Sequence, residues 1–247
     1  MLTTNDWNEK TVDCMESKGG VTALQNPLEN LIRTKIFPFP TPEIIQKLYK
    51  SERGNAFSET QKSSFTNYYT DLQSLNSEDA ITWSVFGVLN YHAEASRNKF
   101  VSDLLALAGI NDAVCTRTCV WLWRRIPHPE TLVSGGPELD FGIITDNTVV
   151  FGESKWNSSV SNNQGVSKRR NQMELRVDFL RKYGVDFFPY AKNKVVLLVS
   201  KGTDNSFDCL SDGVVDVKNI HWEDVCKIES HPLSDEVKRY YYWKIRK

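Results

Sequence analysis

No apolar run in the 247-residue sequence approaches the roughly 20 residues that a membrane-spanning helix requires. Residues 1–18 are polar and acidic, whereas a secretory signal begins basic and continues apolar. The sequence also has almost no excess of either sign of charge, because the formal net charge is −1. This balance argues against a protein that coats nucleic acid non-specifically. We therefore expect a protein of the cytoplasm that has no membrane partner.

Metal-binding spacings of cysteine and histidine are missing as well. The five cysteines show no paired short spacing suited to zinc or to a disulfide framework. Cys115 and Cys119 are the closest pair, and we expect both on one buried face of a strand, as reduced thiols. The four histidines form no recognisable ligand spacing.

The chain changes character near residue 112. Before it the pattern is helical: Pro42 follows Thr41 at a helix start, Ser77 opens another helix, and the segment 92–108 closes at Gly109. We expect a helical N-terminal region of unassigned role over residues 1–76. A second domain is expected over residues 77–247.

The second domain alternates strands and helices. Strands are predicted over residues 114–126, 138–145, 148–156, 194–200 and 214–217, and helices over residues 160–183, ending at Gly184, and 234–246. The order helix, three strands, helix, strand predicts an α/β core with a central mixed sheet flanked by helices.

Asp146-Asn147 is a composition suited to a two-residue turn, because both residues tolerate positive φ. If Thr145 pairs with Thr148, counting back along both strands sets Asp140 opposite Glu153. Directly opposed residues share a face, with Cβ atoms about 4.5–5.5 Å apart. The sequence therefore predicts two carboxylates side by side.

The strand that carries Glu153 is expected to be central in the sheet. Val149 and Phe151 precede Glu153 on one face. Val150 begins the other face, so both faces start apolar, and Lys155 shares the face of Glu153. Like-charged neighbours at the end of a buried strand are costly to desolvate unless something offsets their repulsion. A divalent cation would do so.

This hairpin resembles the PD-(D/E)xK nuclease superfamily, in which a hairpin presents an acid and then an acid-x-lysine triplet. The resemblance is carried by Pro137-Glu138-Leu139-Asp140 and by Phe151-Gly152-Glu153-Ser154-Lys155-Trp156. It covers roughly residues 77 to 200, and Leu139 replaces the proline of the family name. It implies a restriction-endonuclease-like core of bacterial or phage type.

The resemblance also implies a chemistry. Asp140, Glu153 and the backbone carbonyl of Ser154 would hold Mg²⁺, a hard cation that takes oxygen ligands and that Mn²⁺ replaces. Lys155 would orient the attacking water and stabilise the charge that builds on phosphorus. The implied activity is metal-dependent hydrolysis of nucleic acid, DNA in particular, by an endonuclease or exonuclease. A homodimer is a further expectation, because cutting both strands of a duplex commonly uses two sites.

Two acids outside the triplet have open roles. Glu94 lies on the helical stripe continued by Val101 and Leu105, so its carboxylate is expected to face the sheet. In the superfamily an acid from this helix often joins the metal ligands; the alternative is a first-turn glutamate favoured by the helix dipole. Glu138 is either a further ligand or a partner that orients one.

Arg169, Gln172 and Arg176 recur at i, i+3 and i+7 and therefore share one helix face. This row would form a phosphate clamp. A similarly placed glutamine occurs in several branches of the superfamily, although its usual tyrosine partner is Arg176 here. Solvation of a charged helix face explains the arginines equally well.

Two other interpretations stay open. In the first, a protein of the same fold keeps these residues for structure alone and binds nucleic acid or a partner protein without cleaving it. Alternatively, Lys155 merely pairs with Glu153 at a strand end, or with Glu138 across the hairpin, in an α/β protein that is no nuclease. The opposed aspartate, the apolar strand and the α/β order favour the metal site.

Overall fold

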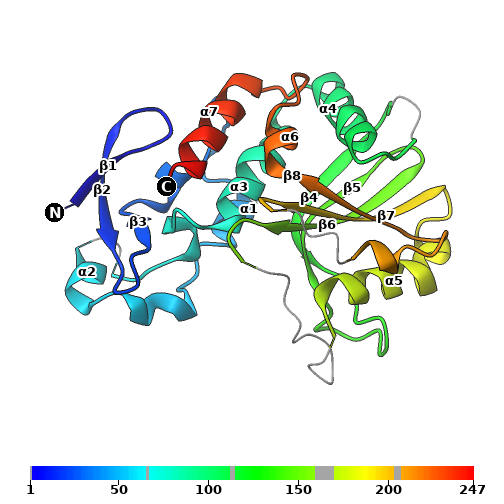
Figure 1. Ribbon diagram of the computed structural model, residues 1–247, viewed down its shortest axis with the longest axis horizontal. Helices are drawn as coiled ribbons and strands as arrows, with labels where there is room; N and C mark the ends of the chain where they lie inside the picture. Colours follow the sequence, from blue (N-terminus) through cyan, green and yellow to red (C-terminus); the bar gives the residue numbers. More distant parts are fainter. Residues whose placement is uncertain (1, 65–66, 112–114, 159–169, 203–206) are drawn as a thin grey trace. The chain divides into compact units, whose positions relative to one another are not determined.

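The computed structural model of the chain describes residues 2–64, 67–111, 115–158, 170–202 and 207–247 (Figure 1). The chain forms two compact units, one of residues 1–91 with 235–247 and one of residues 92–234. The first unit extends beyond residue 76 because the next helix packs within it: Trp83 Nε1 donates to the carbonyl of Ile32 at 3.0 Å. Within the described residues, no helix combines the length and the apolar character needed to cross a membrane.

The N-terminal unit contains an antiparallel sheet that the sequence patterns did not predict. Its order is β1-β2-β3, with strands β1 (Leu2–Asn5), β2 (Thr11–Glu16) and β3 (Thr22–Leu24). The first turn depends on a side chain, because Asp6 Oδ1 accepts from the backbone N–H groups of Asn8 and Lys10 at 2.8 and 2.9 Å. These strands are short and polar, and so they lack the apolar alternation by which strands are recognised. The region is therefore mixed rather than helical.

Short helices make up the rest of this unit. They are η1 (Pro27–Asn30), α1 (Pro42–Ile45), η2 (Glu52–Ala56), α2 (Glu59–Ser63), η3 (Asp71–Gln73), α3 (Glu78–Val85), η4 (Gly87–Tyr91) and the terminal α7 (Ser234–Ile245). The predicted helix starts at Pro42 and after Ser77 are confirmed, and Ser77 Oγ accepts from the N–H of Ala80 at 3.2 Å. Tyr240 ties α7 to the unit by donating to the carbonyl of Asn30 at 2.9 Å.

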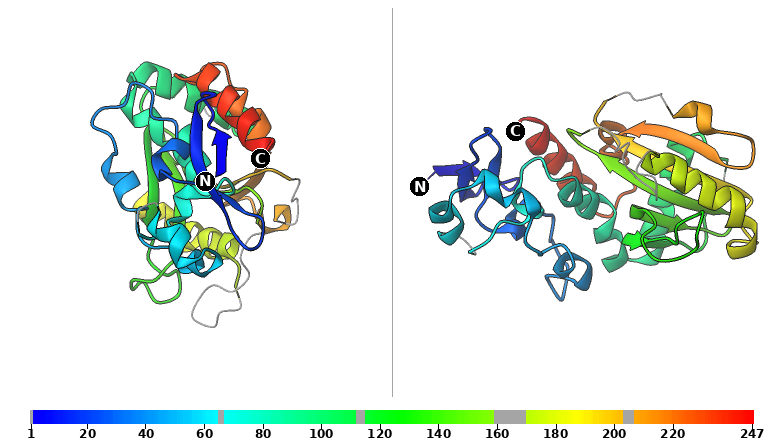
Figure 2. Two further views of the ribbon diagram at one scale, coloured as in Figure 1. Left: turned by 90° about the vertical axis from the view of Figure 1, so that its left-hand side faces the viewer. Right: turned by 90° about the horizontal axis from the view of Figure 1, so that it is seen from below.

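The second unit is a mixed α/β domain, as predicted. Its elements are α4 (Glu94–Leu107), β4 (Cys119–Arg125), β5 (Glu138–Ile144), β6 (Thr148–Lys155), α5 (Gln172–Phe187), β7 (Asn193–Ser200), η5 (Asp208–Leu210), β8 (Asp216–His221) and α6 (Trp222–Cys226). The five-stranded sheet has the order β4-β5-β6-β7-β8. The β4–β5 and β5–β6 pairs are antiparallel, and the β6–β7 and β7–β8 pairs are parallel. Helices α4 and α5 cover opposite faces of this sheet (Figures 1 and 2).

Strand β6 lies at the centre of the sheet, and every residue from Thr148 to Ser154 is buried. On the α5 side, Val149 and Phe151 pack in one apolar cluster with Met173, Val177 and other residues of α5 and β7. The prediction that both faces of this strand are covered is therefore confirmed. A charged side chain on β6 has to find its partners inside the protein.

Helix α5 differs from its predicted bounds at both described ends. It begins at Gln172, where Asn171 and Glu174 form a capping box, and residues 159–169 lie outside the described part. It also continues past Gly184 to Phe187. Gly184 therefore lies inside the helix instead of ending it, with the side chain of Lys194 beside it.

The cysteines also depart from expectation. Cys115 is buried but precedes β4, whereas Cys119 opens β4 and is exposed, so the two do not share a buried face. All five are free thiols, as predicted.

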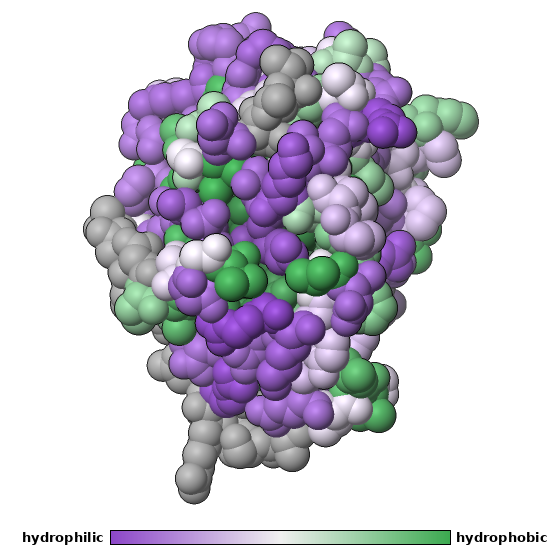
Figure 3. Space-filling view, turned by 90° about the vertical axis from the view of Figure 1, so that its right-hand side faces the viewer, coloured by the Kyte–Doolittle hydropathy of each residue, from purple (hydrophilic) through white to green (hydrophobic). Residues whose placement is uncertain are grey.

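One face of the molecule, the right-hand side of the view in Figure 1, is mainly polar. Figure 3 shows that the described residues on this face are mostly hydrophilic and that hydrophobic residues form small separate groups. The mean hydropathy of −0.42 agrees with such a surface. Single exposed apolar residues of this kind are normal in globular proteins.

The turn between β5 and β6 has the predicted length but another conformation. Thr145 N–H donates to the carbonyl of Thr148 at 2.9 Å, and Thr148 N–H donates back to Thr145 Oγ1 at 2.9 Å. Neither Asp146 nor Asn147 adopts positive φ. Asp146 instead accepts from the backbone N–H and the hydroxyl of Thr116, at 2.7 and 2.8 Å. The turn is thereby tied to the segment before β4.

We expect Asp146→Asn to lower the thermal unfolding midpoint at neutral pH and this deficit to shrink in acid. Hydrogen bonds from the backbone and side chain of Thr116, and from Arg117, lower the pKa of Asp146 from 3.8 to about 2. The ionised carboxylate therefore stabilises the fold above pH 3.8, and this contribution disappears as the pH falls through about 2. Thermal unfolding followed across that range measures it. The exposed Asp186→Asn is the control, and a deficit independent of pH would contradict the assignment.

Candidate active site

The β5–β6 hairpin has the predicted register. Phe141 pairs with Gly152, and the ladder continues to the pair of Ile144 with Val149. Pairing stops at Phe141, one position before the level of Asp140 and Glu153. The two acids therefore lie where the two strands begin to separate.

The sequence predicts that Asp140 and Glu153 form a regular opposed pair. The structure shows that they do not. The hydrogen-bonded pair at Thr145 and Thr148 implies, by alternation, that Ser154 N–H would donate to the carbonyl of residue 139. Instead Ser154 N–H donates to Asp140 Oδ2 at 2.8 Å. The carboxylate of Asp140 thus replaces a backbone acceptor and is fixed beside β6.

The alternation of side chains along β5 also breaks at this point. Leu139 belongs to the buried cluster that packs under α5. Phe141 covers Gly152 on the opposite side of β6, because an added Cβ there would lie 2.4 Å from its ring. Residues two apart in a regular strand share a face, so the strand is twisted at Asp140.

Strand β4 is distorted at the same level. Leu122 pairs with Phe141 and Arg124 with Leu139, which places Trp123 beside Asp140. Trp123 has a φ of 53°, in the left-handed region that costs a bulky residue about 1–3 kcal/mol. Strain of this kind clusters at functional sites. The coincidence of both distortions marks this end of the hairpin as a candidate site.

Glu153 is held between two cations. Its side chain is 1% exposed, and Oε1 lies 2.8 Å from Nζ of Lys155. That contact is an ion pair without hydrogen-bond alignment, because Oε1 has no hydrogen-bond partner among the described residues. Oε2 accepts from Nη2 of Arg176. The strand-end ion pair between Lys155 and Glu153, one alternative from the sequence, is therefore present.

Arg176 is a buried structural partner and not the surface phosphate clamp that the sequence suggests. Its side chain is 0% exposed, and its Nη2 donates both to Glu153 and, at 2.6 Å, to the carbonyl of Glu138. One guanidinium thus ties α5 to both strands of the hairpin where they separate. Its Nε and Nη1 have no hydrogen-bond partner within the described residues.

Of the two remaining members of the predicted clamp, Gln172 lies in the described part of the chain and Arg169 does not. Gln172 is the first residue of α5, and its buried Oε1 has no hydrogen-bond partner in the described part of the chain. Its role at the site stays a prediction.

The structure does not bring the two predicted accessory acids into the site. Glu94 is 60% exposed and pairs with Arg97 at 3.9 Å, because it opens α4 on the solvent side. Glu138 directs its carboxylate to Arg125 at 3.6 Å, and only its backbone carbonyl meets the site. Among the described residues, no cluster of three or more His, Cys, Asp or Glu side chains could hold a metal ion.

The donors that remain fit Mg²⁺ in kind. Asp140 and Glu153 offer carboxylate oxygens. The N–H of Ser154 faces β5, and in an antiparallel pair the carbonyl of the same residue faces the same strand. Mg²⁺ usually binds through one or two carboxylates and keeps several waters, so two acids suffice in number. The site differs from an open metal site because Lys155 and Arg176 both pair with Glu153.

The backbone at Lys155 is firmly held. Its carbonyl accepts from Trp222 Nε1 at 3.1 Å and from Lys201 N–H at 3.2 Å. In the parallel part of the sheet, Lys155 is in register with Ser200 of β7. This bonding fixes the strand end, while the side chain of Lys155 is 13% exposed and pairs with Glu153.

Lys201 is a cation at the same sheet edge that the sequence interpretation missed. It is exposed and follows β7 directly, with its Nζ 3.3 Å from Asn157 Oδ1 and 5.1 Å from the ring centroid of Trp156. Ligands of open α/β sheets bind beyond the carboxyl ends of the parallel strands. A lysine directly after an apolar strand that is buried from Val195 to Ser200 is the signal that would have found it.

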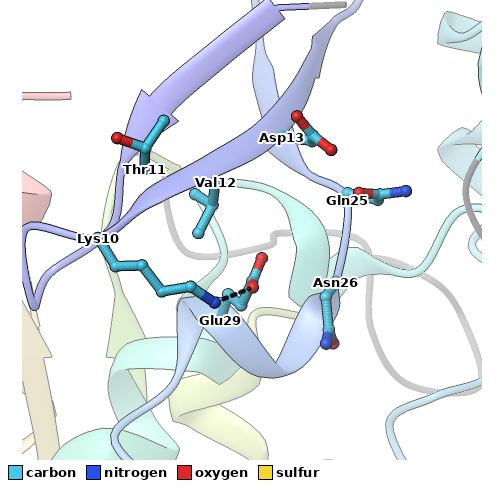
Figure 4. A pocket seen from close by; sticks show the side chains of 7 residues that line it. All are labelled: Lys10, Thr11, Val12, Asp13, Gln25, Asn26 and Glu29. Atoms are coloured by element: carbon cyan, nitrogen blue, oxygen red, sulfur yellow. Dashed lines mark hydrogen bonds and ion pairs between the residues drawn. The ribbon is translucent and has the colours of Figure 1, made fainter.

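A separate hollow of about 560 Å³ lies in the N-terminal unit (Figure 4). Its lining comes from Lys10, β2 and the segment 25–29. Lys10 Nζ reaches Glu29 Oε1 at 3.3 Å, and Gln25 Nε2 donates to the carbonyl of Ser64 at 3.2 Å. The lysine of this lining is thus paired with an acid, and Gln25 bonds the backbone outside the hollow, so we assign no chemistry to it.

Comparison with protein-family models, with curated proteins and with solved structures finds no match to this chain. The chemistry available therefore has to be inferred from the residues. At the separating end of the hairpin, Glu153 pairs with Lys155 and Arg176, and Asp140 binds the backbone of the neighbouring Ser154.

Proposed function

We propose that the chain is a Mg²⁺-dependent phosphodiesterase that hydrolyses nucleic acid, DNA in particular. The observation that carries the proposal is the position of Asp140, bonded to the N–H of Ser154, next to the Glu153–Lys155 ion pair in the chain, where the pairing of β5 with β6 ends. The helix, three strands, helix and strand that surround it support a restriction-endonuclease-like core. The proposed setting is the cytoplasm, in agreement with five free thiols, and cutting of both strands would use a homodimer.

Each residue has a proposed role. Asp140, Glu153 and the carbonyl of Ser154 would hold the metal ion, which when bound supplies Lewis acidity and lowers the pKa of water. Lys155 would leave Glu153 and donate to the phosphate or the attacking water. Its partial exposure and flexible stem allow this movement, whereas the buried Arg176 has no such freedom.

A second candidate is a nuclease-fold module that binds nucleic acid or a partner protein without cleavage. One observation favours it: Arg176 and Lys155 already neutralise Glu153, so the acids coexist without a metal ion. Buried ion pairs of this kind occur as structural elements. The two candidates differ in metal-dependent turnover.

The test is incubation of the purified protein with plasmid and single-stranded DNA, with Mg²⁺ or with a chelator. We expect cleavage that requires Mg²⁺ or Mn²⁺ and that leaves a 5′-phosphate. Binding of DNA without cleavage under any metal condition would replace the proposal by the second candidate. Absence of both binding and cleavage, with DNA and with RNA, would refute the nuclease and leave only a module that binds a partner protein.

We expect Lys201→Ala to weaken DNA binding several-fold in a manner that depends on salt. An exposed lysine that contacts a phosphate releases a counterion on binding, so its loss should reduce the salt slope by about 1. Fluorescence anisotropy with a labelled duplex over a salt series measures both quantities. Lys182→Ala, an exposed lysine on α5, is the control. Equal losses in the two variants would remove Lys201 from the DNA-binding surface.

A further inference from the structure

Four ionisable side chains at the hairpin end carry equal numbers of negative and positive charges. Asp140 and Glu153 contribute two negative charges, and Lys155 and Arg176 contribute two positive charges. A divalent cation added to this set would leave an excess of positive charge in a buried place. Such an excess is costly where the effective dielectric constant is low.

Arg176 cannot leave when a metal ion arrives. It is 0% exposed, and the nitrogen that binds Glu153 also donates to the carbonyl of Glu138. An arginine remains protonated in proteins, so it cannot lose its charge either. Lys155 is different, because its side chain is 13% exposed and carries its charge on a flexible chain.

We propose that Arg176 is a built-in counter-cation, a positioning residue that makes the metal bind tightly only together with a phosphate. The inference rests on the proposed function, because it concerns the same two carboxylates. A phosphate brings negative charge and accepts hydrogen bonds from the displaced Lys155. The metal ion and the phosphate therefore bind together, and neither binds tightly alone.

The coupling has a measurable size. If a phosphate tightens the binding of the metal by a given factor, the metal tightens the binding of the phosphate by the same factor. A coupling of 1–3 kcal/mol is typical and corresponds to about 5–150-fold in affinity. We expect at least about tenfold here, since opposite charges meet in a buried setting.

The experiment is calorimetric titration of the full-length chain with Mn²⁺, alone and with saturating thymidine 5′-monophosphate. This probe supplies a phosphate but no phosphodiester to cut, so the readout is independent of turnover. The reference titration of Mn²⁺ into the nucleotide alone is subtracted. We expect weak binding of Mn²⁺ alone and at least about tenfold tighter binding with the nucleotide.

Variants assign the effect to Arg176. Arg176→Met should bind Mn²⁺ alone at least about tenfold more tightly than the natural chain, because the ion then replaces the missing charge. Its unfolding midpoint should rise on addition of Mn²⁺. Arg181→Met removes an arginine of α5 that pairs with Asp178 and Asp212 at the surface, and it should behave like the natural chain. If Arg176→Met does not fold, the comparison with and without nucleotide still decides on the natural chain.

The outcomes separate the two proposals. Equal Mn²⁺ affinity with and without the nucleotide would overturn the coupling and leave the proposed function standing. Arg176→Met binding Mn²⁺ no more tightly than the natural chain would overturn the role of this residue. Failure to bind Mn²⁺ under both conditions would remove the metal site and, with it, the proposed function.

Discussion

Lys155→Ala should reduce Mg²⁺-dependent cleavage by at least about 10²-fold while DNA binding changes little. The expected size follows from the loss of one group that stabilises developing charge or transfers a proton in the transition state. Asp140→Asn should have at least the same effect. An asparagine carbonyl still accepts the hydrogen bond from Ser154 N–H, so this change removes the charge and keeps the geometry. Initial rates on a labelled duplex, with binding measured in chelator, give both quantities.

Lys227→Ala is the matched control for this experiment. Lys227, the C-cap residue of α6, pairs with Glu223 at 2.6 Å, and both side chains are about half exposed, so its loss breaks a solvent-exposed lysine–glutamate pair in the same unit. Its cleavage rate should equal that of the natural chain. Metal-dependent cleavage that survives both Lys155→Ala and Asp140→Asn would show that the active site lies elsewhere.

The register of the hairpin was predictable because local rules decide it. A two-residue connection between Thr145 and Thr148 fixes which residues face each other, whatever the φ angles of the turn. The apolar pattern of residues 149–151 also identifies a strand covered on both faces. These features depend on neighbours in sequence, and no distant contact overrides them.

The distortion at Asp140 could not be predicted in this way. It involves Trp123 on another strand and Leu139, which packs under α5, so three elements have to meet before it exists. Counting residues assumes that alternation continues. The prediction of a regular pair between Asp140 and Glu153 was therefore wrong in its geometry, although the two residues do lie at the same end of the hairpin.

Periodicity alone also misplaced two charged side chains. Glu94 shares a stripe with apolar residues of α4, but as the first helical residue it turns to solvent. Arg176 borders the apolar stripe of α5, and the sequence favours an exposed position for it. The buried charge of Glu153 draws it inside, and that attraction acts between residues 23 positions apart.

Arg176→Met should destabilise the chain by about 3–5 kcal/mol, as is typical when one partner of a buried ion pair is removed. Among the described residues, Glu153 would then keep Lys155 as its counter-ion in the interior. Because whole domains have unfolding free energies of about 5–15 kcal/mol, this loss is a large fraction of the total. Urea unfolding in the presence of chelator measures it without any contribution from bound metal.

The double variant Glu153→Gln with Arg176→Met distinguishes a charge effect from lost packing. Neutralising both partners removes the unpaired charge, so the double variant should be more stable than Arg176→Met alone by about 1–3 kcal/mol. Arg181→Met provides the surface comparison, since its partly exposed ion pairs should be worth at most about 1 kcal/mol. A loss in Arg176→Met no larger than in Arg181→Met would mean that the guanidinium does not hold Glu153 in solution. The same result would remove the physical basis for a counter-cation at this site.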